Sequence, residues 1–294
     1  MAGVVRSFER FSPGARVGDY HIERELGEDA TGIIYLATHV VLPRQAHLKI
    51  PRSGARTCAI QLLREACILE ALARPGHPGI PHVHECGVLA DRRPWAAIEH
   101  MTGFSFERFA NDGPVGLSDL VVAVRDLADM LRHAHERGVV HGALTAGVVI
   151  RTPRRRSVYS ILDWSCARTL DSEDEVVVDP REDIRALGAI AFRALTGADA
   201  GSGTSAAALC PEAPAELIAV IDEMVSDEPA SRPVATDVYD RAVWLCQTLE
   251  ATPLIERPRW TPPPQGYVPE GVSARRDEDE LTGFAVRIGR PRSS

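Results

Sequence analysis

The sequence predicts an α+β fold with two lobes, a small antiparallel β-lobe followed by a larger, mostly helical lobe. Up to residue 50 the chain runs in short apolar and alternating segments, which is typical of strands. Beyond Gly116 apolar side chains recur at helical spacing instead. With 294 residues, 45% of them hydrophobic, the chain is long enough to bury one large core or two smaller ones.

Between Tyr20 and Ile50, three stretches predict an antiparallel meander. They read "YHIEREL", "GIIYLATHV" and "QAHLKI", with turn residues between them. Residues 56–73 place apolar side chains at helical spacing, so we expect an amphipathic helix there. Two more strands are expected near 81–89 and 95–99, completing the β-lobe.

The second half of the chain predicts a set of helices. Ser118 is the expected N-cap of a first helix with a wide apolar stripe from Leu120 onward. Residues 183–197 are apolar nearly all round and predict a central buried helix. Helices near 214–226 and 235–250 complete the set.

The composition of the last residues predicts a Pro-rich tail without a core of its own. Its segment 261–269, "TPPPQGYVP", either presents a polyproline helix to a partner or stays a disordered solubilising tail. The predicted layout is an N-terminal extension (1–17), a two-lobed domain (18–250, with a β-lobe 18–99, a connection 100–104 and a helical lobe 105–250), and a disordered tail (251–294).

Charge and cysteine usage limit the class of protein. The net charge of −8 argues against a nucleic-acid or anionic-membrane partner, because both favour a basic surface. The six cysteines are scattered without a C-x-x-C motif, so we expect reduced core residues of a cytosolic protein. Since no apolar run reaches transmembrane length and the N-terminus has no signal-peptide core, the expected location is cytoplasmic.

A series of short motifs follows these elements in a fixed order. They are "LGEDATGIIYLA" with Gly27 and Gly32, "HLKI" with Lys49, "LREACIL" with Glu65, "AIEHM" with Glu99 and Met101, "ERGVVHGALTAGVVI", and "SILDWSCAR" with Asp163. Lys49 is the only lysine among 33 basic residues. In this order and spacing, the motifs resemble the protein kinase family, and in particular its bacterial Ser/Thr type, over roughly residues 18–250.

The resemblance implies a bilobal protein-kinase-like fold with ATP and Mg²⁺ between the lobes. Lys49 would bridge the nucleotide phosphates and Glu65, a task that suits a compact ammonium better than a planar guanidinium. Asp163 would hold Mg²⁺, and the glycines at 27 and 32 would line the phosphate loop. Residues 97–101 would form the hinge, where Glu99 and Met101 offer backbone groups to the adenine ring.

The catalytic loop departs from the family pattern. The family's H-R-D motif is His141-Gly142-Ala143, so the carboxylate that accepts the substrate proton is missing. Val148 stands at the position of the asparagine that holds a second metal ion, and Thr145 replaces a lysine. A general base alone contributes on the order of 10²–10⁴ in rate, so little phosphoryl transfer is expected.

Two further regions differ in the same direction. Asp29 replaces the middle glycine of the phosphate loop and brings a negative charge toward the phosphates, which makes ATP binding weak or absent. From Asp163 to Asp183 the chain is too short for a full activation loop and contains no recognisable A-P-E motif. Arg232 is retained, but the glutamate of A-P-E that usually pairs with it is missing.

The sequence therefore predicts a pseudokinase, a kinase-fold scaffold or allosteric regulator that docks to another protein, such as an active kinase. For Lys49, Glu65 and Asp163 two interpretations stay open: a weak nucleotide site, or an ion-pair network that aligns the lobes. The alternative function is an atypical Ser/Thr kinase or another ATP-using transferase in which a displaced acid, for example one of residues 171–175, supplies the missing base.

Overall fold

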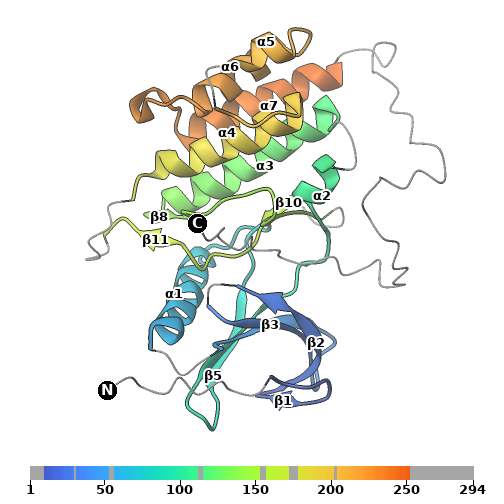
Figure 1. The fold of residues 1–294 in the computed structure, drawn as a ribbon, viewed down its shortest axis with the longest axis vertical. Coiled ribbons are helices and arrows are strands. Elements are labelled where there is room, and N and C mark those ends of the chain that lie inside the picture. The colour runs from blue at the N-terminus through green and yellow to red at the C-terminus, as the bar shows by residue number, and fades with distance from the viewer. Residues whose placement is uncertain are drawn as a thin grey trace, which may run out of the picture.

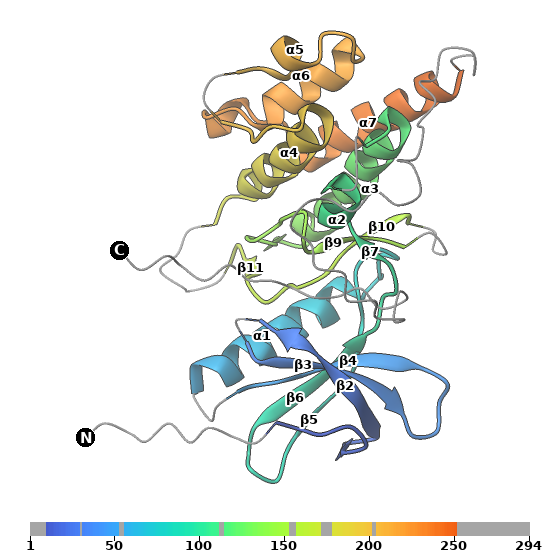
Figure 2. The same cartoon turned by 45° about the vertical axis from the view of Figure 1, so that its right-hand side comes forward.

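The structure is a computed structural model, and it describes residues 10–29, 31–52, 56–111, 115–152, 157–171, 178–201 and 204–251. A strand-rich lobe and a helical lobe meet along one side, and the chain crosses between them after β6 (Figure 1 and Figure 2). The predicted α+β fold with two lobes is confirmed. The predicted tail 251–294 lies outside the described residues except for Ala251, so that prediction is untested.

The smaller lobe is a six-stranded antiparallel sheet with strand order β1-β2-β3-β4-β6-β5. Helix α1 packs on β5 and β6 (Figure 2). The bounds are β1 Arg16–Val17, β2 Tyr20–Glu28, β3 Ile33–His39, β4 Gln45–Ile50, α1 Arg56–Leu72, β5 Val83–Val88 and β6 Pro94–Glu99. Strands β2 to β6 and α1 each lie close to a predicted element, because period-two and helical patterns are strong in these segments. No strand was predicted at β1, which falls within the predicted N-terminal extension 1–17.

The larger lobe is built on α3, which contacts both α4 and α7. Its helices are α2 Phe106–Asn111, α3 Leu117–His135, α4 Pro180–Thr196, α5 Ala206–Leu209, α6 Ala215–Met224 and α7 Ala235–Ala251, with a 3₁₀ turn η1 at Pro229–Ser231. Short strands lie between the helices and the cleft: β7 Phe104–Ser105, β8 Val139–Val140, β9 Val149–Arg151, β10 Tyr159–Ile161 and β11 Arg168–Thr169. Helices α2 and α5 were not predicted, because they are too short to show a helical period.

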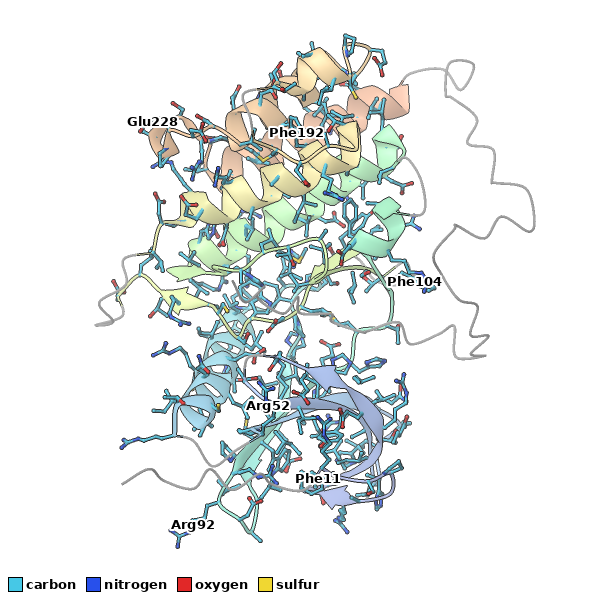
Figure 3. All side chains as sticks on the ribbon, viewed as in Figure 1. Phe11, Arg52, Arg92, Phe104, Phe192 and Glu228 are labelled. Atoms are coloured by element: carbon cyan, nitrogen blue, oxygen red, sulfur yellow. The ribbon has the colours of Figure 1, made fainter. Side chains whose placement is uncertain are left out.

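Two large hydrophobic cores stabilise the lobes. One lies in the sheet around Tyr20, Leu48 and Trp95. The other fills the helical lobe and continues into α1 through Leu62 and Leu69, so the inner face of α1 belongs to the same core as α3. Figure 3 shows side chains such as Phe192 between the helices and Phe11 beside the strands. This shared core fixes α1, and with it Glu65, against the larger lobe.

Two local predictions were wrong. Helix α3 begins two residues earlier than expected, with Gly116 rather than Ser118 as its N-cap, and no side chain caps it. The cysteines are free, as expected, but they are not core residues, since three are exposed and three half-buried. Among the described residues no helix has the length and apolar character needed to cross a membrane.

Candidate functional site

Lys49 and Glu65 meet at the boundary between the lobes. On β4 successive side chains alternate between the two faces of the sheet, so Leu48 enters the β-lobe core while Lys49 faces the cleft. The Nζ atom of Lys49 lies 2.7 Å and 2.8 Å from the two carboxylate oxygens of Glu65. Both side chains are buried. The structure thus brings together the lysine and the glutamate that the sequence paired.

Asp163 reaches the same lysine from the larger lobe. It follows β10 with a positive φ of 50°, and its Oδ1 lies 3.4 Å from Lys49 Nζ and accepts a hydrogen bond from the Ser165 amide. Its side chain is 24% exposed. The next residue, Trp164, is fully buried, and its ring packs edge-on against His141 with 4.7 Å between the ring centroids. Trp164 is therefore part of the hydrophobic core.

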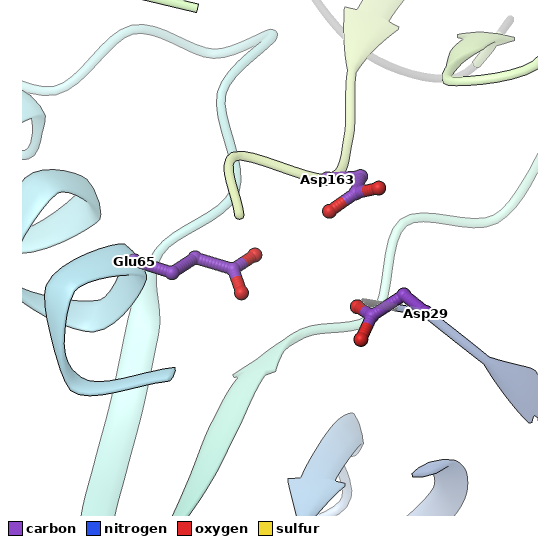
Figure 4. Close-up of side chains that lie close together, drawn as sticks. All are labelled: Asp29, Glu65 and Asp163. Carbon is purple, nitrogen blue, oxygen red and sulfur yellow. The ribbon is translucent and has the colours of Figure 1, made fainter. Parts of the chain in front are cut away.

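Asp29 lies inside the cleft rather than at its mouth, which corrects the picture of a charge that only repels phosphates. It is 3% exposed, and its Oδ2 lies 2.7 Å from Lys49 Nζ. Figure 4 shows the carboxylates of Asp29, Glu65 and Asp163 pointing toward one space. Lys49 is therefore surrounded by carboxylates from three segments of the chain.

These charges are unequal in number. If all four groups are ionised, three carboxylates and one ammonium leave a net charge of −2 in a mostly buried space. Burial opposes the charged form of Lys49, but Glu65, Asp29 and Asp163 together raise its pKa. Burial, only partly offset by Lys49, raises the pKa of Glu65 to about 7, and the other two carboxylates add to this. For Asp29, Lys49 and the hydrogen bonds of its own loop outweigh burial and lower the pKa.

Little space remains beside these groups. The cavity that they line has a volume of about 30 Å³, which holds about one water molecule. His47, two residues before Lys49 on β4, lines the same cavity, and its Nε2 lies 2.7 Å from His100 Nδ1. Burial lowers the pKa of His47 to about 3, with His100 and Lys49 contributing, so its imidazole is neutral.

His47 was not among the site residues predicted from the sequence. The signal that could have found it is the period of two along β4, which places residues 47 and 49 on the same face of the strand. A bulky ring beside Lys49 narrows the cleft further.

The hinge residues lie at the end of β6. Glu99 lines the cavity, and its amide donates to the carbonyl of His82 at 2.7 Å. Met101 is buried in a small cluster with Ile150 and Leu162. The structure therefore places both residues beside the cleft, and their contact with an adenine ring stays a prediction.

The loop from His141 to Val148 is anchored through its backbone. Asp183 of α4 accepts hydrogen bonds from the amides of His141 and Gly142, each at 2.8 Å, and from His135 Nε2 at 2.9 Å. The side chain of Ala143 is exposed beside this anchored turn, and Val148 is buried in the helical core. No side chain of the loop offers a carboxylate.

Arg232 has a glutamate partner, although this glutamate does not belong to an A-P-E motif. Its Nη1 lies 2.6 Å from Glu182 Oε1, in the first turn of α4, and the guanidinium is buried. Glu182 directly precedes Asp183, so the shortened segment keeps the ion pair by bringing an acid from the start of α4. The sequence "DPRED" carried this signal without matching A-P-E.

The phosphate-loop glycines have structural roles here. A Cβ on Gly32 would lie 2.2 Å from the carbonyl oxygen of Ile50, so only glycine lets this loop pack on β4. Gly27 adopts a φ of 154° with open space around it. The close approach of residue 32 to β4 is what carries Asp29 into the cleft.

The space beside Lys49 is small in this arrangement. A drug-sized ligand needs a pocket of roughly 300 Å³ or more, whereas the cavity at Lys49 measures about 30 Å³. The oxygens of Asp29, Glu65 and Asp163 lie within 4.8 Å of one another, a spacing that could suit a cation, but the ammonium of Lys49 already lies among them. The described geometry is that of an ion-pair cluster between the lobes.

The chain is similar in sequence to bacterial serine/threonine-protein kinases. No protein-family model matches the chain. The chain is 28% identical over 224 residues to the serine/threonine-protein kinase PknJ of Mycobacterium tuberculosis, covering 67% of this chain and 37% of PknJ. It is 24% identical over 268 residues to the serine/threonine-protein kinase pkn3 of Myxococcus xanthus, covering 75% of this chain and 48% of pkn3. The chain therefore spans less than half the length of these relatives.

Solved structures show the same fold. A kinase domain of PknI from M. tuberculosis, a double mutant, superposes with a TM-score of 0.63 at 23% identity, covering 81% of this chain and all of that one. Titin kinase with its flanking domains gives a TM-score of 0.67 at 20% identity, covering 80% of this chain and 48% of that one. These likenesses show the protein-kinase fold.

Proposed function

We propose that this chain, a homologue of bacterial serine/threonine-protein kinases with the protein-kinase fold, is a pseudokinase that regulates or scaffolds another protein. The observation that carries the proposal is the turn from His141 to Ala143. Asp183 holds its backbone in place, yet the residue at the catalytic position ends in an exposed methyl group. A framework positioned for catalysis without a proton acceptor supports binding as the function.

A regulatory role needs a surface for a partner. On α1, Ile60 and Leu63 are each 46% exposed, and the same helix carries Glu65 on its buried side. A protein that binds this helix would act directly on the Lys49–Glu65 pair. This supports a protein partner, such as an active kinase, and the chemistry of the described residues does not select a particular one.

The second candidate function is an atypical kinase or another ATP-using transferase. It is favoured by one observation, the meeting of Lys49, Glu65 and Asp163 at the positions that the family uses for phosphoryl transfer. The displaced acid would come from residues 171–175, of which only Asp171 lies within the described part of the chain.

Incubation with γ-labelled ATP, Mg²⁺ or Mn²⁺ and generic protein substrates separates the two functions. A pseudokinase transfers no label above the level of its Asp163→Asn variant. Turnover by the wild type that Lys49→Ala and Asp163→Asn both abolish would overturn the proposal and establish the enzyme. An active kinase in the same assay serves as the positive control.

A further inference from the structure

The ammonium of Lys49 has more anionic partners than it needs. Glu65 binds it with both oxygens, and Asp163 approaches from the other lobe. The third carboxylate, Asp29, comes from the short loop between β2 and β3 and lies as close as Glu65 does, at 2.7 Å. A buried ammonium with one such partner is already paired, so the extra carboxylate calls for an explanation of its own.

Hydrogen bonds from Thr31 and Gly32 fix the position of the Asp29 carboxylate. Its Oδ1 accepts hydrogen bonds from the amide and hydroxyl of Thr31, at 2.8 and 2.6 Å, and from the amide of Gly32, at 2.9 Å. Its Oδ2 is left to face Lys49. Gly32 in turn packs against β4 so closely that a Cβ would not fit. The loop therefore presents one carboxylate oxygen to the ammonium as a preorganised ligand.

We propose that Asp29 is an internal anionic ligand of Lys49, which occupies the place where an oxyanion such as a phosphate group would contact the ammonium. The inference rests on the proposed function and specifies how its cleft is regulated. Asp29 and a bound oligophosphate exclude each other, because both require the same face of Lys49.

Charge and space both support exclusion. With Asp29 in place the cluster carries a net charge of −2 when ionised, so a phosphate entering beside it meets unbalanced negative charge in a buried setting. The cavity of about 30 Å³ leaves no room for a phosphate chain next to the carboxylate. An anion gains access to Lys49 only when the contact between Asp29 and Lys49 breaks.

The test measures binding of sodium tripolyphosphate, and of ATP without metal, by isothermal titration calorimetry at low ionic strength. Asp29→Asn keeps an oxygen for Thr31 and Gly32 but removes the negative charge beside Lys49. We expect this variant to bind tripolyphosphate at least about tenfold more tightly than the wild type. Asp29→Gly, which also removes the side chain, should show the same gain and serves if the amide variant folds poorly.

Two control variants test whether the gain in tripolyphosphate affinity comes from the contact between Asp29 and Lys49. Asp19→Asn removes the same charge from the same lobe at a side chain that is 55% exposed and pairs with Arg16, and it should bind like the wild type. Adding Lys49→Met to Asp29→Asn should abolish the gain, because the ammonium is the binding group.

Equal binding of tripolyphosphate by the wild type and both folded Asp29 variants would overturn the inference, as would an equal gain in Asp19→Asn. Either result would leave the pseudokinase proposal standing. Label transfer from ATP by the wild type would overturn the pseudokinase proposal, but it would not show whether Asp29 and phosphate compete for Lys49. The two failures are therefore distinguishable.

Discussion

The two walls of the cleft keep different parts of the family's site. On the β-lobe side, Lys49 and Glu65 retain their charges, and Asp29 adds another. On the helical side, the turn at His141 retains its backbone anchor to Asp183, while Ala143 and Val148 carry no polar group. One wall carries charged side chains that form ion pairs with Lys49, and in the other the residues at 143 and 148 are apolar. We expect each wall to contribute to the stability of the fold, and the two walls can be tested separately.

The largest effect is expected from removing the cation. Lys49→Met leaves three carboxylates facing one another without a counter-charge, and breaking a buried ion pair costs about 3–5 kcal/mol. The free energy of unfolding from urea titration should fall by that amount. Arg16→Met, which removes an exposed cation from the same lobe, should cost no more than about 1 kcal/mol. A similar small loss in both variants would show that the Lys49 cluster does not stabilise the fold.

On the helical wall the corresponding variant is Asp183→Ala. It leaves the amides of His141 and Gly142 without their acceptor, at a cost of roughly 1–3 kcal/mol for each buried group. We expect a loss of about 3 kcal/mol in the free energy of unfolding. Asp199→Ala, at an exposed position beside Arg193, should change it by less than about 1 kcal/mol. Equal losses in the two variants would contradict the anchoring role.

The dependence of the free energy of unfolding on pH tests the raised pKa of Glu65. Its folded pKa of about 7 lies above the ordinary value of 4.5, so its contribution to stability is complete below pH 4.5 and is lost as the pH rises through 7. Glu65→Gln removes the titrating group. The urea concentration at the unfolding midpoint should therefore fall less between pH 5 and pH 8 in this variant than in the wild type. Glu70→Gln, exposed on the same helix, is the matched control and should behave like the wild type. A wild-type midpoint that rises across this range would contradict the assignment.

The smallest effect is expected where the catalytic residue is restored. Ala143→Asp adds a carboxylate at an exposed position, so the free energy of unfolding should change by no more than about 0.5 kcal/mol. Peptide phosphorylation should stay absent, because the metal ligand at Val148 is still missing and the segment before Asp183 is still short. Groups that act as a unit are not restored one at a time. Robust phosphorylation by this single variant would show that a substrate platform exists elsewhere in the chain.

Much of this arrangement was readable from the sequence. Strands β2 to β6 and α1 followed from their periods, and the resemblance placed Lys49, Glu65 and Asp163 in one site, where the structure also has them. Local patterns succeed here because the side chains of strands and helices point in directions fixed by the backbone.

The remainder depended on tertiary packing. The inward turn of Asp29 follows from the approach of Gly32 to Ile50, a contact between segments that no local pattern reveals. The partner of Arg232 was missed because Glu182 does not lie in the expected motif, although it reaches the same guanidinium. The contact of His47 with His100 joins β4 to the hinge across 53 residues of sequence.

A double-mutant cycle on Asp29 and Lys49 tests the central claim most directly, because it measures the energy that couples these two side chains. The free energies of unfolding of the wild type, Asp29→Asn, Lys49→Met and the double variant give that energy by difference. A closed cluster in which Asp29 is a ligand of Lys49 predicts a favourable coupling of about 1.5 kcal/mol or more, within the range of roughly 0.5–3 kcal/mol seen for contacting residues. A coupling below about 0.5 kcal/mol would show that the two residues act independently, and would contradict the account.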